Sequence, residues 1–213
     1  MSGRPFTRAE LGIDPLQVAR LLLGARLETD SPAGSVGVRI VEVEAYRGAE
    51  DPAAHSYRGR TARNAVMFGP PGHLYVYFVY GMHFCANVVG QADGVAGGVL
   101  LRAGEVVSGM ELARTRRPSA RSEHDLGKGP ARLTSALGLD LADNGIDLTR
   151  RDSRVRLLTG EPVADNDIRT GPRVGVGAAM DLPWRFWVAG SPAVSTYRRG
   201  GKQRPKAPGT VAR

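Results

Sequence analysis

The sequence predicts an α+β fold in which one domain is built on a curved, mainly antiparallel β-sheet with helices at its periphery. Segments rich in β-branched and aromatic residues recur along the chain, and segments with helix-capping residues lie between them. The 213 residues are 42% apolar, enough for a substantial core, and no repeat or linker divides them. We therefore expect a single domain over residues 1–197, followed by a basic, disordered tail over residues 198–213.

The first elements are a short helix and a pair of strands. The helix is expected over residues 14–24, because Asp14 is a suitable N-cap and Pro15 suits the first helical position. Strands are expected at residues 25–29 and 35–46, on either side of a turn that contains Pro and Gly.

The rest of the chain continues the alternation of strands and helices. Residues 47–72 are rich in Gly, Pro and Arg and predict a long loop, a feature that is often functional in a compact domain. A strand or hairpin is expected at residues 73–89 and another strand at 97–107. The later elements are a helix at 108–118 capped by Ser108, a helix at 129–139, and strands at 155–160 and 185–195.

The composition argues against a membrane protein. No run of 18 apolar residues is present, and the first residues lack the apolar core of a signal peptide. The single cysteine, Cys85, cannot form an internal disulfide, which agrees with a reducing compartment. We therefore expect a cytoplasmic protein.

The charge is unevenly distributed along the chain. The net charge of +8 and the pI of about 10.2 indicate a polyanionic partner. Six of the positive charges lie in residues 198–213, which contain no acidic residue, so removing them from the total of +8 leaves only +2. That tail is either an electrostatic arm for nucleic acid or a solubilising end. Seven basic and four acidic residues between Arg102 and Arg132 predict a locally basic side of the domain.

Two carboxylates stand near the end of the second expected strand, in the segment VEVEAY at residues 41–46. Because side chains alternate along a strand, one face is expected to carry Val36, Val38, Ile40, Glu42, Glu44 and Tyr46. Acidic side chains are rarely fully buried without a partner or a purpose. The strand therefore either reaches solvent at this point or carries an active site.

A carboxylate in a poorly solvated pocket is a good general base for water. Tyr46 and His55 follow closely and could hydrogen-bond to a planar ligand or stack on it. The alternative is a metal-dependent nuclease or phosphodiesterase, because carboxylate and imidazole groups also bind metals. Its ligands would be Glu42, Glu44, Asp51 and His55. The spacing matches no metal motif, so we expect neither a metal nor another cofactor.

Five aromatic residues fall within residues 75–84, YVYFVYGMHF. Tyr75 and Tyr77 are expected on one strand face, where such a stripe either belongs to the core or forms a platform for a ligand. Tyr80 and Met82 flank a glycine that permits a tight turn. If that turn is exposed, its apolar side chains form a wedge of the kind that enters DNA base steps.

The loop at residues 56–64 carries Arg58, Arg60 and Arg63 beside the suspected site. It is either a solvated loop or a surface that contacts phosphates, for which arginine is well suited. The wedge and these arginines alone would suit a DNA-binding module without catalysis, which is a third interpretation.

A series of segments together resembles the alkyladenine DNA glycosylase family, the mammalian type of 3-methyladenine DNA glycosylase. The segments occur in the family's order over about residues 7–196. They are VEVEAY, AAHS, RN-x-x-MF, PG-x-LYVY-x-x-YGM-x-FC-x-N, DG followed by VLLRA, GP-x-(R/K)-L, RVGVG, RF and GSP-x-VS.

The resemblance implies roles for the reacting groups. Glu44 would be the general base that activates water to attack C1′ of a damaged nucleotide flipped out of duplex DNA. Arg102 would help to position Glu44 and the water, and the carbonyl of Val174 would be a further water contact. Glu42 has no such role by resemblance.

The resemblance also implies how the DNA would be held. The residues that would line the pocket and sandwich the flipped base are Tyr46, His55 and Tyr77. Asn87 would sit at the pocket edge and discriminate against the 2-amino group of normal guanine. Tyr80 would fill the vacated position in the base stack, with Met82 beside it in the groove.

The implied reaction is hydrolysis of the N-glycosidic bond of 3-methyladenine, 7-methylguanine, hypoxanthine or ethenoadenine, leaving an abasic site. A lyase that forms a Schiff base needs an amine nucleophile, and the first lysine in the chain is Lys128. We therefore expect a monofunctional glycosylase. Its partner would be double-stranded DNA containing damaged purines, and we expect a monomer associated with the nucleoid.

Overall fold

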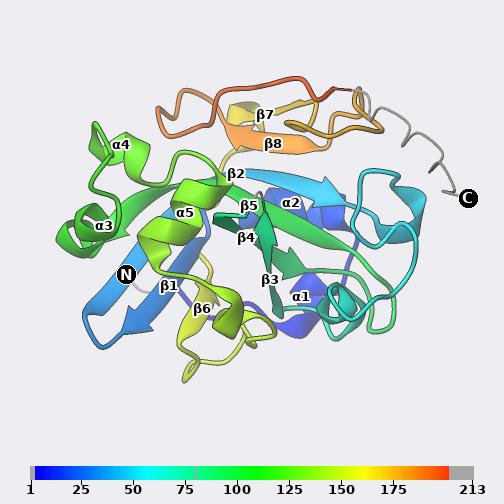
Figure 1. Cartoon of the computed structure of the whole chain (residues 1–213), viewed down its shortest axis with the longest axis horizontal. Helices are drawn as coiled ribbons and strands as arrows, with labels where there is room; N and C mark the ends of the chain where they lie inside the picture. Colours follow the sequence, from blue (N-terminus) through cyan, green and yellow to red (C-terminus); the bar gives the residue numbers. More distant parts are fainter. Residues whose placement is uncertain (1–2, 80, 202–213) are drawn as a thin grey trace, which may run out of the picture.

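The architecture is an open antiparallel sheet with helices around it (Figure 1). The computed structural model describes residues 3–79 and 81–201. Within these residues the sheet has eight strands, in the order β3-β4-β5-β2-β1-β6, and β8 pairs with both β2 and β7. Every strand pair is antiparallel. The predicted α+β class, with a mainly antiparallel sheet in a single domain, is confirmed.

Strand β2 (Gly34–Tyr46) is the longest strand and the centre of the sheet. Its first half pairs with β1 (Arg26–Ser31), its second half pairs with β8 (Arg185–Val188), and β5 (Gly98–Ser108) runs along most of its length. A strand with partners on both sides has its main-chain groups satisfied by the sheet and is held rigidly. Side chains at the end of β2 are therefore fixed in position.

The end of β2 is more deeply buried than the sequence predicted. The register against β5 shifts between Ile40 and Glu42 and again between Glu42 and Val43. Such bulges bend a strand and disturb its alternation. The end of the predicted face is kept, because Arg102 contacts both Glu42 and Glu44 and the Tyr46 hydroxyl donates to Glu44. All residues from 41 to 45 are buried, and the interpretation that the strand reaches solvent there is wrong.

The aromatic segment forms the expected hairpin, with β3 (Leu74–Val79) and β4 (His83–Val89) paired from Leu74–Val88 to Val79–His83. Strand β4 pairs with β5 through Asn87, Val88 and Val89. Because β4 joins the hairpin to the centre of the sheet, the side chains of β3 and β4 are brought near the end of β2.

Helix α2 (Pro15–Leu22) begins as predicted, since the Asp14 carboxylate accepts a hydrogen bond from the Leu16 N–H at 2.8 Å. Helix α5 (Pro130–Leu137) also matches its prediction and ends at Gly138, whose φ of +67° suits glycine. Helices α1 (Arg8–Leu11) and α4 (Glu123–Leu126) are single turns. In Figure 1, α3, α4 and α5 lie toward one end of the sheet.

Helix α3 (Met110–Arg116) differs from its prediction at the N-terminus. Gly109, in the left-handed conformation, occupies the N-cap position, whereas Ser108 is the last residue of β5. The predicted cap at Ser108 is therefore wrong, because the strand continues farther than its apolar pattern. A Cβ atom at position 109 would lie 2.1 Å from the Ser35 carbonyl oxygen, so this tight turn requires glycine.

The late strands are shorter than expected. Strand β6 covers Val155–Leu158 and β8 only Arg185–Val188, so the chain from 189 to 195 leaves the sheet instead of extending it. Strand β7 (Ile168–Gly171), which pairs with β8, has no counterpart in the sequence-based prediction. Short 3₁₀ turns are η1 (Gly48–Glu50), η2 (Ala65–Phe68), η3 (Leu141–Asp143) and η4 (Asp165–Asp167).

The long loop after β2 is held by side chains rather than by strands. Asn64 donates to the carbonyls of His55 and Gly59, both at 3.0 Å, and accepts from the Thr61 N–H at 2.6 Å. Asp51 forms a two-pronged ion pair with Arg173, at 2.5 and 2.8 Å, and both side chains are fully buried. This pair ties the loop to the segment after β7.

The C-terminal segment that the structure describes bears on the prediction of a basic tail. Arg198 accepts a hydrogen bond from the Gly175 N–H at 2.9 Å, so the start of the predicted tail lies against the domain. Residues 202–213, which complete that tail, lie outside the described residues.

In the part of the chain that the structure describes, no helix combines the length and apolar character that a membrane crossing requires.

We expect Asp51→Ala to lower the free energy of unfolding by about 3–5 kcal/mol, because it leaves the buried guanidinium of Arg173 uncompensated. Urea unfolding measures this change. Asp152→Ala is the matched control, because it removes an equivalent ion pair with Arg150 that is exposed. Equal loss in the two variants would contradict a structural role for the buried pair.

Candidate active site

A pocket of about 430 Å³ opens where β2, β3, β4 and β5 lie side by side. Its wall is completed by the long loop after β2 and by residues 174–177. Seven of the residues singled out in the sequence line this one pocket: Glu44, Tyr46, His55, Tyr77, Asn87, Arg102 and Val174. We call it the aromatic pocket, and its size is within the usual range for a small-molecule site.

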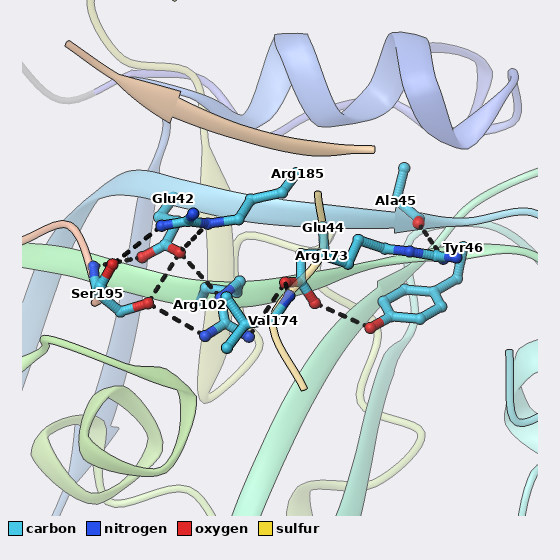
Figure 2. A network of polar contacts seen from close by, with 9 residues as sticks. All are labelled: Glu42, Glu44, Ala45, Tyr46, Arg102, Arg173, Val174, Arg185 and Ser195. Carbon is cyan, nitrogen blue, oxygen red and sulfur yellow. Dashed lines mark hydrogen bonds and ion pairs between the residues drawn. The ribbon is translucent and has the colours of Figure 1, made fainter. Parts of the chain in front are cut away.

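Glu44 lies in the wall of the aromatic pocket, yet its side chain is 0% exposed. The Tyr46 hydroxyl donates to Glu44 Oε2 at 2.9 Å, and the Val174 main-chain N–H donates to Oε1 at 2.6 Å. Arg102 Nη1 lies 3.3 Å from the same Oε1 (Figure 2). These three contacts compensate for the loss of water around the carboxylate and fix its orientation.

Glu42 is also fully buried and holds a network of its own (Figure 2). Its Oε1 accepts from Arg102 Nε at 2.9 Å and from Arg185 Nε at 2.7 Å. Ser195 donates its main-chain N–H to Oε2 at 2.6 Å and its hydroxyl to Oε1 at 2.9 Å. Glu42 thus joins β5, β8 and the segment that follows β8.

This arrangement does not favour the metal-dependent alternative. Of the four ligands that it requires, Glu42 and Glu44 are bound by Arg102, and Asp51 is bound by Arg173. Within residues 3–79 and 81–201, no group of three or more His, Cys, Asp or Glu side chains is arranged to hold a metal ion. The carboxylate oxygen atoms that a metal would need already accept hydrogen bonds or ion pairs from arginine, tyrosine and main-chain donors.

Aromatic rings form one wall of the pocket. The rings of Tyr75 and Tyr77 stack with centroids 5.2 Å apart, and the His55 ring meets Tyr77 edge-on at 4.5 Å. The Tyr75 hydroxyl lies 3.4 Å from His55 Nδ1. Partial burial and, second, the charge of Arg63 lower the pKa of His55, so its imidazole is mainly neutral at pH 7.

The tyrosine hydroxyls in the pocket keep their protons. Burial and then the Glu44 charge raise the pKa of Tyr46 well above its ordinary value. Burial is also the main cause that raises the pKa of Tyr77 well above normal. Tyr46 therefore serves as a hydrogen-bond donor to Glu44 at any physiological pH.

Asn87 and Cys85 lie on β4 at the pocket wall, and both are buried. Asn87 Nδ2 donates to the Tyr75 carbonyl at 3.4 Å. Burial raises the pKa of the Cys85 thiol, which makes a reactive thiolate unfavourable. Asn87 is therefore the polar side chain of β4 that lines the pocket.

The tip of the β3–β4 hairpin is only partly described. Met82 is 68% exposed, as a wedge at an exposed turn requires. Tyr80, the other residue predicted for the wedge, lies outside the described residues. On the neighbouring β3 face, Phe78 is exposed and packs against Phe84 with ring centroids 5.1 Å apart.

The three loop arginines predicted to contact phosphates are all exposed, but they are not equivalent. Arg63 Nη2 donates to the Phe78 carbonyl at 2.9 Å, and its guanidinium lies 5.9 Å from the Tyr77 ring centroid. Arg63 therefore packs on the hairpin beside the pocket, whereas Arg58 and Arg60 extend from the preceding part of the loop.

A larger cavity of about 980 Å³ adjoins the aromatic pocket, and Arg102 and Val174 line both. Its basic lining residues are Arg102, Arg121, His124, Lys128, Arg132 and Arg198. We call it the basic groove. The sequence predicted a locally basic side from the charge bias between residues 102 and 132, and the groove brings four of those residues together.

Three residues that organise the site were not identified from the sequence. Ser195 and Arg185 bind Glu42, and Arg173 binds Asp51 while its guanidinium packs 4.5 Å from the Tyr46 ring centroid. A buried arginine looks like a surface arginine in sequence, because its partner is distant in the chain. All three residues lie in segments that carry the family resemblance, RVGVG, RF and GSP-x-VS, and that membership was the available signal.

Comparison with known proteins identifies the family of this chain. The family model of methylpurine-DNA glycosylase (MPG) matches residues 9–192. Relatives named "Putative 3-methyladenine DNA glycosylase" include one from Nocardia farcinica, 55% identical over 207 residues, covering 95% of this chain and 94% of the relative. Another, from Streptomyces avermitilis, is 52% identical over 196 residues, covering 91% and 92% respectively. This chain belongs to the methylpurine-DNA glycosylase family.

Proposed function

We propose that this DNA glycosylase flips a damaged purine out of duplex DNA and hydrolyses its N-glycosidic bond with a water molecule activated by Glu44. The observation that carries the proposal is a fully buried carboxylate in the wall of an aromatic pocket of about 430 Å³. The names of the relatives support 3-methyladenine as one substrate.

Glu44 has two tasks in this mechanism. As a general base, it takes a proton from the water that attacks C1′. As an anion in a poorly solvated pocket, it stabilises the positive charge that develops on the sugar as the base departs. Tyr46 and the Val174 N–H orient the carboxylate, and Arg102 and the Val174 carbonyl would contact the water.

The pocket walls suit a flat, electron-poor base. A purine alkylated at N3 or N7 is cationic, and an electron-rich aromatic face attracts a cation by roughly 0.5–2 kcal/mol. We propose that Tyr46, His55 and Tyr77 enclose the base, and that Asn87 discriminates against the 2-amino group of guanine. The neutral state of His55 favours this role, because an imidazolium would repel a cationic base.

The basic groove extends the pocket toward the DNA backbone. Phosphates flanking the flipped nucleotide would lie along Arg121, Lys128 and Arg132. The exposed Arg58, Arg60 and Arg63 would contact the backbone on the hairpin side of the pocket, where Met82 and Tyr80 would enter the duplex.

The reaction is proposed to stop at the abasic site. A lyase requires an amine within reach of C1′, and the residues that line the aromatic pocket include no lysine in the described part of the chain. Lys128 lies in the adjoining groove, where its ammonium donates to the Pro192 carbonyl at 2.8 Å. Action as a monomer and association with the nucleoid stay predictions, as does the range of substrates.

We expect Glu44→Gln to lower the single-turnover rate of base release by about 10²- to 10⁴-fold, because the amide keeps the shape but cannot accept the proton. Duplexes containing hypoxanthine or methylated purines are incubated with each protein, and abasic sites are revealed by hot alkali. Binding to the same duplexes is expected to be retained. A non-catalytic DNA-binding module would instead show no base release with either protein.

We expect excess chelator to leave base release unchanged, because Arg102 and Arg173 already bind the carboxylates that a metal would use. The same duplexes are assayed with and without chelator, and without the alkali step. Strand cleavage that needs no alkali and disappears with chelator would support the metal-dependent nuclease.

We expect Arg121→Ala to weaken duplex binding and to lower the slope of log K against log salt by about 1, because one phosphate contact is lost. The loss should be similar for damaged and undamaged duplexes. Arg150→Ala is the control, since Arg150 is also exposed but pairs with Asp152 and does not line the groove. Identical salt slopes for Arg121→Ala and the wild type would remove Arg121 from the DNA interface.

A further inference from the structure

Two buried carboxylates of β2 share one arginine beside the aromatic pocket. Arg102 Nε lies 2.9 Å from Glu42 Oε1, and Arg102 Nη1 lies 3.3 Å from Glu44 Oε1. All three side chains are at most 7% exposed. The proposed mechanism uses Glu44 and Arg102 but assigns nothing to Glu42, although a buried charge of this kind is costly unless it has a purpose.

Glu42 is the better-bound of the two carboxylates. It accepts hydrogen bonds from two guanidinium groups and from both the main chain and the hydroxyl of Ser195. These donors come from β5, β8 and the segment after β8, so the position of Glu42 is fixed from three directions. Glu42 is therefore a rigid anchor for Arg102.

The bonds to this anchor determine which part of Arg102 reaches Glu44. Arg102 Nε is bound by Glu42, and Arg102 Nη2 donates to the Ser195 hydroxyl at 3.1 Å. Two bonds fix the plane of a guanidinium group, so only Nη1 is directed toward Glu44. An arginine without such constraints prefers a two-pronged contact with a carboxylate.

The same anchor balances the local charge. Two carboxylates face two guanidinium groups, those of Arg102 and Arg185. Without the negative charge of Glu42, Glu44 would be the one carboxylate left to pair with Arg102. A stronger ion pair would bind the Glu44 lone pairs that must accept a proton from water.

We propose that Glu42 is a positioning residue for base release: by holding Arg102 through Nε and through Ser195, it restricts Arg102 to one contact with Glu44 and leaves the Glu44 carboxylate available to water. The proposal rests on the proposed function of Glu44. It assigns to Glu42 an effect on the chemical step and none on DNA binding.

The test is a double-mutant cycle measured by single-turnover base release from a methylated duplex and from a duplex containing hypoxanthine. Glu42→Gln is expected to lower the rate by about 10- to 100-fold while the dissociation constant for the duplex stays within about twofold of the wild type. In the Arg102→Gln background the same change is expected to cost less than about twofold, because Glu42 acts through Arg102.

Two further variants separate positioning from a general loss of structure. Ser195→Ala removes the hydroxyl that receives Arg102 Nη2 and should lower the rate by a smaller factor than Glu42→Gln. Arg185→Gln removes the other guanidinium bound to Glu42 but no contact with Glu44, and should lower the rate less than Glu42→Gln does. Melting temperatures show whether each variant is folded. If Glu42→Gln is not folded, Ser195→Ala is tested in its place.

The outcomes are distinct. A rate for Glu42→Gln equal to the wild type, or a full additional loss in the Arg102→Gln background, would overturn the positioning role. Equal rate losses in Glu42→Gln and Arg185→Gln would assign Glu42 to the fold alone. Base release by the wild type, and its loss in Glu44→Gln, are measured first. This control verifies the reaction itself, so a failure of the proposed function is recognised separately from a failure of this inference.

Discussion

The arrangement of charges at the end of β2 is the constraint on which the rest of the site depends. Glu42 and Glu44 are both fully buried, and neither would be stable there as an anion without donors that replace water. Those donors come from β5, from β8 and from the segments at Val174 and Ser195. The need to satisfy two carboxylates therefore brings together chain segments that are more than 50 residues apart.

This constraint explains why the residues proposed for catalysis also hold the fold together. The aromatic pocket is formed where four strands meet, and its polar wall consists of groups that also hold those strands together. The buried pair of Asp51 and Arg173 does the same for the long loop that carries His55. A site supported in this way is rigid before substrate enters, which is what electrostatic stabilisation of a transition state requires.

Much of the architecture could be predicted from local patterns. The helices at α2 and α5 have their caps and prolines in sequence, and the β3–β4 hairpin has its glycine turn between aromatic strands. The failures have physical reasons. Bulges at Glu42 leave no local signal, so the burial of all residues from 41 to 45 was not predicted. The start of α3 depends on a close approach of Gly109 to Ser35, which is a long-range contact.

The site was predicted in part for the same reasons. Resemblance to a family identified seven residues that the structure gathers in one pocket, whereas residue types alone suggested a general base among the carboxylates of β2 without choosing Glu44. The arginines and the serine that hold the carboxylates were missed, because burial and pairing are properties of the folded chain. The basic groove was indicated by charge bias, but its position beside the pocket required the three-dimensional arrangement.

The most direct test of the central claim is mass spectrometry of the products formed from methylated duplex DNA. The account predicts free methylated purine bases together with strands whose phosphodiester bonds are intact and whose mass has changed by replacement of a base with hydroxyl. Free bases should be absent when the protein carries Glu44→Gln. Strands cut at phosphate with no free base, or equal base release by both proteins, would contradict a hydrolytic glycosylase that uses Glu44 as its base.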